Sequence, residues 1–208
     1  GMFKTKQMVR ELLILFLVML CAILLSGVLL FLNRSAEQTQ LKHMTERNFC
    51  AAHIYENLLG MEHALGAGGS QAGRGEAYRE QSGRLEQNLQ DMAVMAADSE
   101  RLIGYVQQID GFQRSQERLW RETDGDQAVS ASLELLEQQK LCAQNLIDEN
   151  FRVSSEKYLE DMRVIDRQRL TVWGCVAVIL FSGMILMFNR LRQLPDALEE
   201  NLRANQGR

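Results

Sequence analysis

The chain has 208 residues, of which 23 are Lys or Arg and 27 are Asp or Glu, so its formal net charge at pH 7 is −4. Nucleic-acid binding is not expected of a domain with this acidic balance. We find no nucleophile beside a plausible base, no paired carboxylates on a rigid scaffold and no metal-ligand cluster, so the sequence predicts neither an enzyme nor a cofactor site.

The three histidines do not have the spacing of a metal site. His43, His53 and His63 lie ten residues apart in one predicted helix, which turns each by about 80° from the last and separates neighbours by about 15 Å. One metal ion cannot contact all three, and we interpret them as separate residues on a solvated helix face.

The first element along the chain is an uncharged apolar run over residues 12–32. Its length matches the roughly 20 residues that a helix needs to cross a bilayer, so we predict a transmembrane helix. Residues 1–11 are predicted to be cytoplasmic, because basic residues beside membrane helices stay on that side: Lys4, Lys6 and Arg10. A cleaved signal peptide is the alternative, but its apolar stretch is shorter and ends at a small-residue cleavage site.

The region over residues 33–170 is predicted to be a helical domain. It contains 16 Lys and Arg against 23 Asp and Glu, has no proline and is rich in good helix formers. Apolar residues recur there in steps of three and four, which is the stripe of a helix in a bundle. Four stripes follow one another: Met44, Ala51, Ile54, Leu58, Met61 and Leu65; Tyr78, Leu85, Leu89 and Met92; Leu102, Tyr105, Ile109, Phe112 and Leu119; Leu133, Leu136, Ala143, Ile147, Phe151, Tyr158, Met162 and Ile165.

Three breaks separate these stripes. Residues 66–75 are glycine-rich and are predicted to be a flexible, non-helical turn, and residues 97–99 form a softer break. Residues 123–126 form a further turn, in which Asp126 is a candidate cap for a helix that begins near Ser130. We therefore expect an all-α protein: an antiparallel up-down-up-down four-helix bundle whose first and last helices are continuous with two transmembrane helices.

The predicted helix lengths separate the two cysteines of this domain. At 1.5 Å per residue, Cys50 lies about 25 Å from the membrane and Cys142 about 42 Å. A disulfide needs Cα atoms within about 7 Å, so we expect no bridge within the chain. A bridge between two Cys50 residues across a dimer stays open.

A second apolar run, over residues 171–188, predicts the second transmembrane helix. Arg190 and Arg192 follow it and place its end on the cytoplasmic side, while Trp173 suits an anchor at the outer interface. The remaining residues, 189–208, are predicted to be cytoplasmic.

This arrangement resembles the sensor modules of bacterial chemoreceptors and sensor histidine kinases. In those families a HAMP linker follows the second membrane helix, and residues 189–202 are similar to its start, with Pro195 the only proline of the chain. Asp196 departs from the family pattern, which commonly has Leu after the proline. The resemblance implies a homodimer in the bacterial inner membrane, with residues 33–170 extracytoplasmic and a role in signal transmission for Pro195.

Ligand-binding candidates come from comparing heights along the two long helices. His53 is predicted to lie level with Asn150, and Asn57 level with Asn145 or Leu146, so that polar groups could face each other between the helices. The alternative is that these residues face water beside the apolar stripe. The first helix has no arginine beyond Arg47, so the dicarboxylate ligands of aspartate-type receptors are not expected.

Two functions follow from these patterns. The preferred one is a transmembrane sensor module, in which an unknown small-molecule or protein stimulus displaces a helix and the displacement reaches a cytoplasmic output domain that this chain does not contain. The alternative is a non-sensory membrane scaffold or assembly protein whose helical bundle binds another protein.

Overall fold

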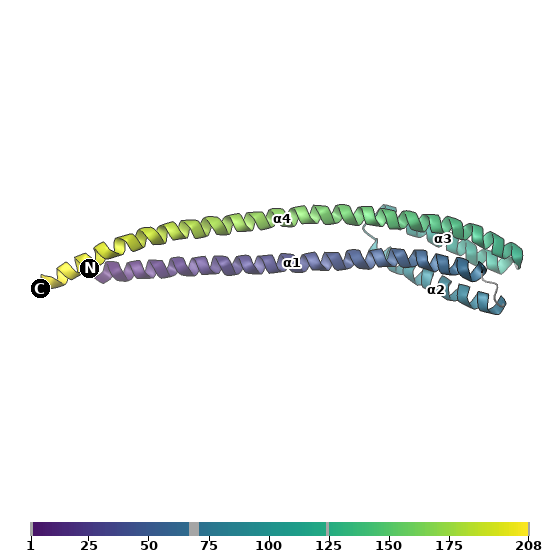
Figure 1. Cartoon of the computed structure of the whole chain (residues 1–208), viewed down its shortest axis with the longest axis horizontal. Helices are drawn as coiled ribbons and strands as arrows, with labels where there is room; N and C mark the ends of the chain where they lie inside the picture. The colour runs from purple at the N-terminus through teal and green to yellow at the C-terminus, as the bar shows by residue number, and fades with distance from the viewer. Residues whose placement is uncertain (1, 67–70, 124, 208) are drawn as a thin grey trace. The chain divides into compact units, whose positions relative to one another are not determined.

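The computed structural model describes residues 2–66, 71–123 and 125–207, and these residues form four helices and no strands (Figure 1). The helices are α1 (Met2–Gly66), α2 (Gln71–Met95), α3 (Glu100–Glu122) and α4 (Asp126–Gln206). The all-α prediction is confirmed. The chain divides into two compact units: residues 39–159 form one, and residues 1–38 with 160–208 form the other.

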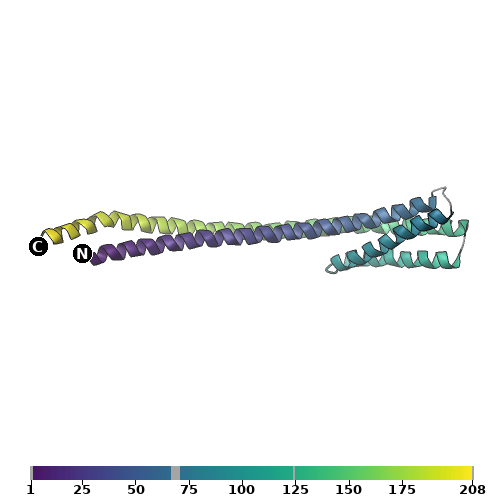
Figure 2. The same cartoon turned by 90° about the horizontal axis from the view of Figure 1, so that it is seen from below.

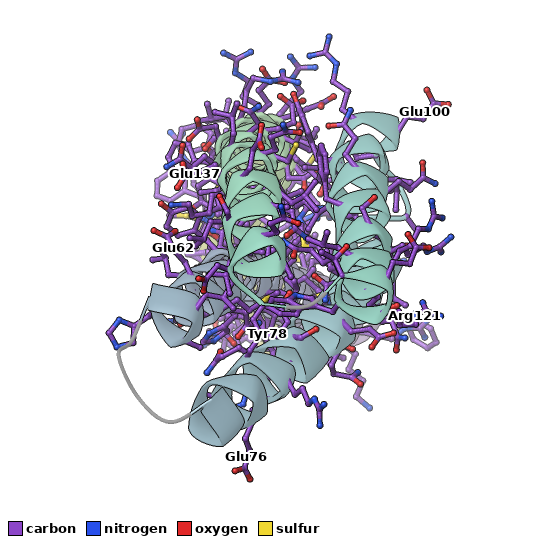
Figure 3. All side chains as sticks on the ribbon, turned by 90° about the vertical axis from the view of Figure 1, so that its right-hand side faces the viewer. Glu62, Glu76, Tyr78, Glu100, Arg121 and Glu137 are labelled. Carbon is purple, nitrogen blue, oxygen red and sulfur yellow. The ribbon has the colours of Figure 1, made fainter. Side chains whose placement is uncertain are left out.

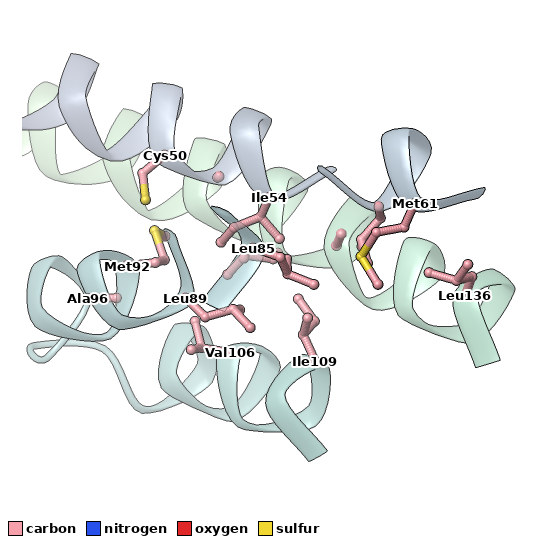
Figure 4. Packing of buried hydrophobic residues seen from close by; sticks show 14 of the residues in the cluster. Cys50, Ile54, Met61, Leu85, Leu89, Met92, Ala96, Val106, Ile109 and Leu136 are labelled. Atoms are coloured by element: carbon pink, nitrogen blue, oxygen red, sulfur yellow. The ribbon is translucent and has the colours of Figure 1, made fainter. Parts of the chain in front are cut away.

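The unit of residues 39–159 has one apolar core to which all four helices contribute (Figure 4). The predicted stripes of α1 and α2 are confirmed from Ala51 to Leu65 and from Tyr78 to Met92, since all of their members are buried. In Figure 4 the sulfur atoms of Cys50 and Met92 face each other between α1 and α2. Burying each large apolar side chain contributes roughly 1.5–3 kcal/mol, which makes this core the main source of stability for the unit.

The predicted stripes of α3 and α4 are partly wrong. The buried residues of α3 are Leu102, Val106, Ile109, Gln113 and Gln116. Phe112 and Leu119, which the stripe predicted as core, are only partly buried. On α4, Phe151 was also predicted as core but is 68% exposed. The physical reason is that hydrogen-bonded glutamines occupy inner positions of both helices, and a stripe built from apolar residues alone passes over them.

The helix ends follow local capping chemistry. Ser99 is the N-cap of α3, and its side-chain oxygen accepts a hydrogen bond from the Leu102 amide at 3.5 Å, so the predicted break at residues 97–99 is confirmed. Gly125 has a φ of +82°, a conformation that favours glycine, and its carbonyl accepts from the Val129 amide at the start of α4. Asp126 is therefore the first helical residue and not the cap, and α4 begins earlier than the predicted Ser130.

The predicted turn over residues 66–75 is shorter than expected. Residues 67–70 and residue 124 lie outside the described residues, but α2 already begins at Gln71 and includes Gly75. Glycine disfavours a helix by only about 1 kcal/mol per residue, which the packing of the rest of α2 outweighs.

Side-chain contacts within this unit join α1 to α4 in a regular order. Asn150 donates to Asn48, Gln144 donates to Tyr55 at 3.2 Å, and Lys140 pairs with Glu62. The residue number falls along α4 as it rises along α1. Figure 3 shows Glu62 and Glu137, the two carboxylates that hold Lys140, on the same side of the domain.

In the other unit, the remaining parts of α1 and α4 lie side by side in two perpendicular views (Figures 1 and 2). Glu37 pairs with Arg169 at 3.2 Å, and Glu11 pairs with Arg190 at 3.0 Å. Between these pairs Gly183 allows a close approach, because a Cβ added there would lie 2.7 Å from the sulfur of Met19. The two helices therefore pack directly along this unit.

Both α1 and α4 contain a segment long and apolar enough to cross a membrane, judged by length and composition. Most large apolar side chains of these segments are exposed in the structure, for example Phe31 at 73% and Phe181 at 70%. Exposed apolar surface on this scale is typical of a membrane or protein interaction site.

Candidate ligand-binding site

A polar cavity of about 520 Å³ lies between α1 and α2, and it contains two of the four predicted ligand residues. Its lining residues are His53, Glu56, Asn57, Gly60, Gln81, Arg84, Gln87 and Asn88. Residues three and four apart on a helix lie on one face, which explains why His53, Asn57 and Gly60 reach the same space from α1.

Asn57 is the most buried polar residue of this cavity, with 6% of its surface exposed. Its side-chain Nδ2 is buried and has no hydrogen-bond partner among the described residues. A buried amide without a partner costs about 1–3 kcal/mol, and a ligand that supplied an acceptor would remove this cost.

His53 lies at the exposed edge of the same cavity. Its Nδ1 is 3.1 Å from the Glu56 carboxylate, and its ring stacks on Phe49 with centroids 6.4 Å apart. Opposite, a Cβ added at Gly60 would lie 2.8 Å from the Gln81 side chain. The absence of a side chain at Gly60 thus lets Gln81 lie close against α1.

The other two predicted residues do not line this cavity. Asn150 is 1% exposed, and its Nδ2 donates to the Oδ1 of Asn48 across α1 and α4. Asn145 is exposed on α4. The structure therefore brings His53 and Asn57 together, but beside α2, and it pairs Asn150 with Asn48 five residues earlier on α1 than expected. Counting 1.5 Å per residue estimates the height of a side chain along the helix axis but not its direction around the axis. That direction decides which neighbouring helix the side chain faces.

The lining side chains of the cavity are rich in hydrogen-bond donors. The amides of Gln81 and Asn88, the Asn57 amide and the Arg84 guanidinium are all potential donors, although Arg84 also pairs with Glu80 at 2.7 Å. Such a set suits a small polar molecule with several acceptor oxygens. It does not supply a nucleophile beside a base.

Sequence reasoning missed a buried hydrogen-bond network in the core of the domain. Gln116 lies at its centre: its Nε2 donates to the Ser132 carbonyl at 3.0 Å and to Gln139 Oε1 at 3.3 Å, and its Oε1 accepts from the hydroxyls of Tyr78 and Ser132. Gln139 also donates to the Ile109 carbonyl and to Gln113 Oε1. The available signal was glutamine at the helical repeat of Leu102 and Ile109, which indicates an inner position.

Burial and ion pairing shift several pKa values in this unit. Burial raises the pKa of the Cys50 thiol to about 11, with Asp91 adding to the effect, and the thiol donates to the Asn88 carbonyl at 3.2 Å. Burial also raises the pKa of Tyr78. Hydrogen bonds to Glu137 and Glu62 raise the pKa of Lys140.

All four cysteines are free, as expected for Cys50 and Cys142 within one chain. Among the described residues, no group of three His, Cys, Asp or Glu side chains is placed to hold a metal ion.

Pro195 lies inside α4, which continues beyond it to Gln206. Because proline has no backbone N–H, the Leu191 carbonyl loses its helical donor at this point. Six residues later, Asn201 donates to Thr5 of α1 at 2.8 Å. Pro195 therefore removes one backbone hydrogen bond from α4, while the segment after it is mostly exposed and contacts α1 through Asn201.

Comparison with protein-family models, with curated proteins and with solved structures finds no match to this chain.

Proposed function

We propose that this chain is the sensor module of a transmembrane signalling protein. In this proposal residues 33–170 form an extracytoplasmic antiparallel four-helix bundle, residues 12–32 and 171–188 cross the bacterial inner membrane, and both termini are cytoplasmic. A stimulus at the bundle displaces α1 or α4, and the displacement reaches the segment around Pro195.

The observation that carries the proposal is the composition of α1 and α4. Each contributes both an apolar segment of membrane-crossing length and part of the core of residues 39–159. In the proposal each of the two is one continuous helix, which would transmit a displacement in the bundle along its axis to the membrane segment.

The order of side-chain pairs supports the antiparallel bundle. Asn48 pairs with Asn150 and Glu62 with Lys140, which is the order expected of two neighbouring helices that run in opposite directions. The short connections between α2 and α3 and between α3 and α4 favour antiparallel neighbours there as well.

A homodimer would use the side of α1 and α4 that faces away from the core. Phe49 on α1 and Phe151 on α4 each follow a residue of the Asn48–Asn150 pair, so both project to the same side of the helix pair. They are 62% and 68% exposed. Leu59, Leu141 and Leu159 are further exposed apolar residues of these helices. A second copy would bury this surface, and a two-fold dimer is the commonest symmetry for such assemblies.

The test is disulfide crosslinking between two copies at the inner end of the second span. The variant Phe188→Cys is made in a background without the native cysteines, and its crosslinking rate in membranes is compared with and without Gln139→Leu in the domain core. We expect Gln139→Leu to change the rate severalfold while circular dichroism shows a folded protein.

The matched control is Val94→Ser, on a residue that is 78% exposed on α2, and it should leave the rate unchanged. An absence of crosslinks, or equal rates in a folded Gln139→Leu protein, would contradict the proposal.

A further inference from the structure

A second, larger cavity lies between α2, α3 and the start of α4, away from His53 and Asn57. Its volume is about 820 Å³, within the range of small-molecule sites. The principal apolar and aromatic residues of its lining are Leu65, Tyr78, Trp120 and Val129. The rings of Tyr78 and Trp120 are tilted at 58° with centroids 5.6 Å apart, and Figure 3 shows Tyr78 inside the domain while Arg121 points outward.

Two glycines of α2 line this cavity. Gly75 and Gly83 both line it, and a Cβ added at either would meet no atom within 4 Å. Eight residues apart, the two positions lie close to one face of the helix. A glycine inside a helix costs about 1 kcal/mol relative to alanine. At these two positions the missing side chains leave space beside the aromatic rings unfilled.

The charged lining residues have both signs. Arg79, Glu86 and Asp126 line the cavity without an ion pair among the described residues, whereas Arg121 lies 4.0 Å from Glu117. The buried indole N–H of Trp120 makes no hydrogen bond of good geometry among the described residues, although it lies close enough to the Tyr78 hydroxyl to offset part of the rise that burial causes in the pKa of that group. A buried indole N–H normally has a hydrogen-bond acceptor.

The inner wall of the cavity belongs to the buried glutamine network. Gln113, which is 3% exposed, lines the cavity and donates to Ser82 of α2. Gln113 accepts from Gln139 of α4, and Tyr78 donates to Gln116. A molecule that moved Tyr78 or Gln113 would therefore change hydrogen bonds made by α4, the helix that contains the second apolar segment.

We propose that this cavity binds an aromatic zwitterion of amino-acid size. Its ring would lie against Trp120 and Tyr78, its carboxylate near Arg79, and its ammonium group near Glu86 or Asp126. As the entry point of a stimulus, the site depends on the proposed sensor function. As a binding site, it does not.

The test uses the full chain in detergent with Trp173→Phe, so that Trp120 is the one tryptophan left to report by fluorescence. The probes are L-phenylalanine, phenylacetate and phenethylamine, which share a ring and differ in charge. We expect a saturable change of Trp120 emission with L-phenylalanine and at least about tenfold weaker binding of the other two.

Gly83→Leu should fill the cavity and weaken the response to L-phenylalanine at least about tenfold. Gly111→Leu is the matched control, because a Cβ at Gly111 also meets no atom within 4 Å but this residue does not line the cavity. It should leave the response within about twofold. Both changes raise helix propensity, so the fold is expected to persist.

No saturable response to L-phenylalanine, an equal response in folded Gly83→Leu, or equal binding of phenylacetate would overturn the assignment. The Phe188→Cys crosslink, repeated with L-phenylalanine, separates the two proposals. Binding without a change in crosslinking supports the site and contradicts its role as the stimulus entry point. A failure to bind leaves the sensor function to be judged by the Gln139→Leu comparison alone.

Discussion

Arg47 of α1 donates through Nη2 to the hydroxyl of Ser154 on α4 at 2.9 Å, and both side chains are buried. A second nitrogen of the same guanidinium lies 3.6 Å from Asp98, in the connection between α2 and α3. One side chain therefore joins three parts of the domain. A displacement of α1 against α4 would break the Arg47–Ser154 hydrogen bond or would move Ser154 together with Arg47.

Replacing Arg47 with Ala should destabilise the domain. The change removes the donor to buried Ser154 and the partner of Asp98, at a cost of about 1–3 kcal/mol. Thermal unfolding followed by circular dichroism measures it. Arg84→Ala is the control, because Arg84 makes an exposed ion pair with Glu80 that contributes less than about 1 kcal/mol. Equal effects of the two variants would show that the Arg47 contacts are not specific.

The Gln116–Gln139 contact should give a non-additive double-mutant cycle. Each single change to Leu leaves the buried partners of the removed amide unsatisfied, including the other glutamine, and should cost about 1–3 kcal/mol. The double variant removes both amides, so its loss of unfolding free energy should be smaller than the sum. Denaturant unfolding measures all four proteins. Strict additivity would mean that the two amides act independently.

Cys50 should be the less reactive of the two cysteines in the domain. With a pKa of about 11, roughly one Cys50 thiol in a thousand is ionised at pH 8, and the sulfur is buried. Cys142 is partly exposed. A soluble maleimide should therefore modify Cys142 first in a protein without Cys21 and Cys175, and both at similar rates after unfolding.

The same shift predicts a pH dependence of stability. The pKa of folded Cys50 lies above its ordinary value of 9.0, so the stability of the neutral buried thiol is present below pH 9 and is lost as the pH rises through about 11. The melting temperature should fall more between pH 9 and 11 in the wild type than in Cys50→Ala. A parallel fall in both proteins would assign the loss to other groups, such as Lys140.

Phe151→Glu should weaken the proposed dimer. The new charge would stand on the outer surface of α1 and α4, where desolvation opposes association. Co-purification of two differently tagged copies measures the effect, and we expect a severalfold loss. Val94→Glu places the same charge on α2, at a residue that is also highly exposed, and should leave co-purification unchanged. If both variants co-purify normally, the dimer surface lies elsewhere.

The proposed orientation predicts which cysteines a membrane-impermeant maleimide reaches in intact cells. In a background without native cysteines, Val94→Cys should be labelled from outside, whereas Leu202→Cys should be labelled only after permeabilisation. Both positions are exposed in the structure, so burial does not protect either one. Labelling of Leu202→Cys in intact cells would contradict the proposed cytoplasmic location of the C-terminal segment.

Some of the fold follows directly from local sequence patterns. The inner faces of α1 and α2 were predictable because Ile54, Leu58, Leu85 and Leu89 are apolar residues at helical spacing. The inner face of α3 was not predictable, because glutamines such as Gln113 and Gln116 are expected at the surface unless their hydrogen-bond partners on α4 are known. The candidate site divided in the same way: His53 and Asn57 share a cavity, but Asn150 faces Asn48, because helix rotation depends on packing.

The sequence by itself determined that the chain is helical, that α1 and α4 carry apolar segments of membrane-crossing length, and where α3 begins. These properties depend on composition, on periodicity and on capping residues such as Ser99, all of which are local. Only the tertiary structure decided that glutamines lie in the core, that Cys50 is buried against α2 and that two cavities border α2. Each of these depends on which side chains meet across helices, and that is set by the combined packing of elements distant in the chain.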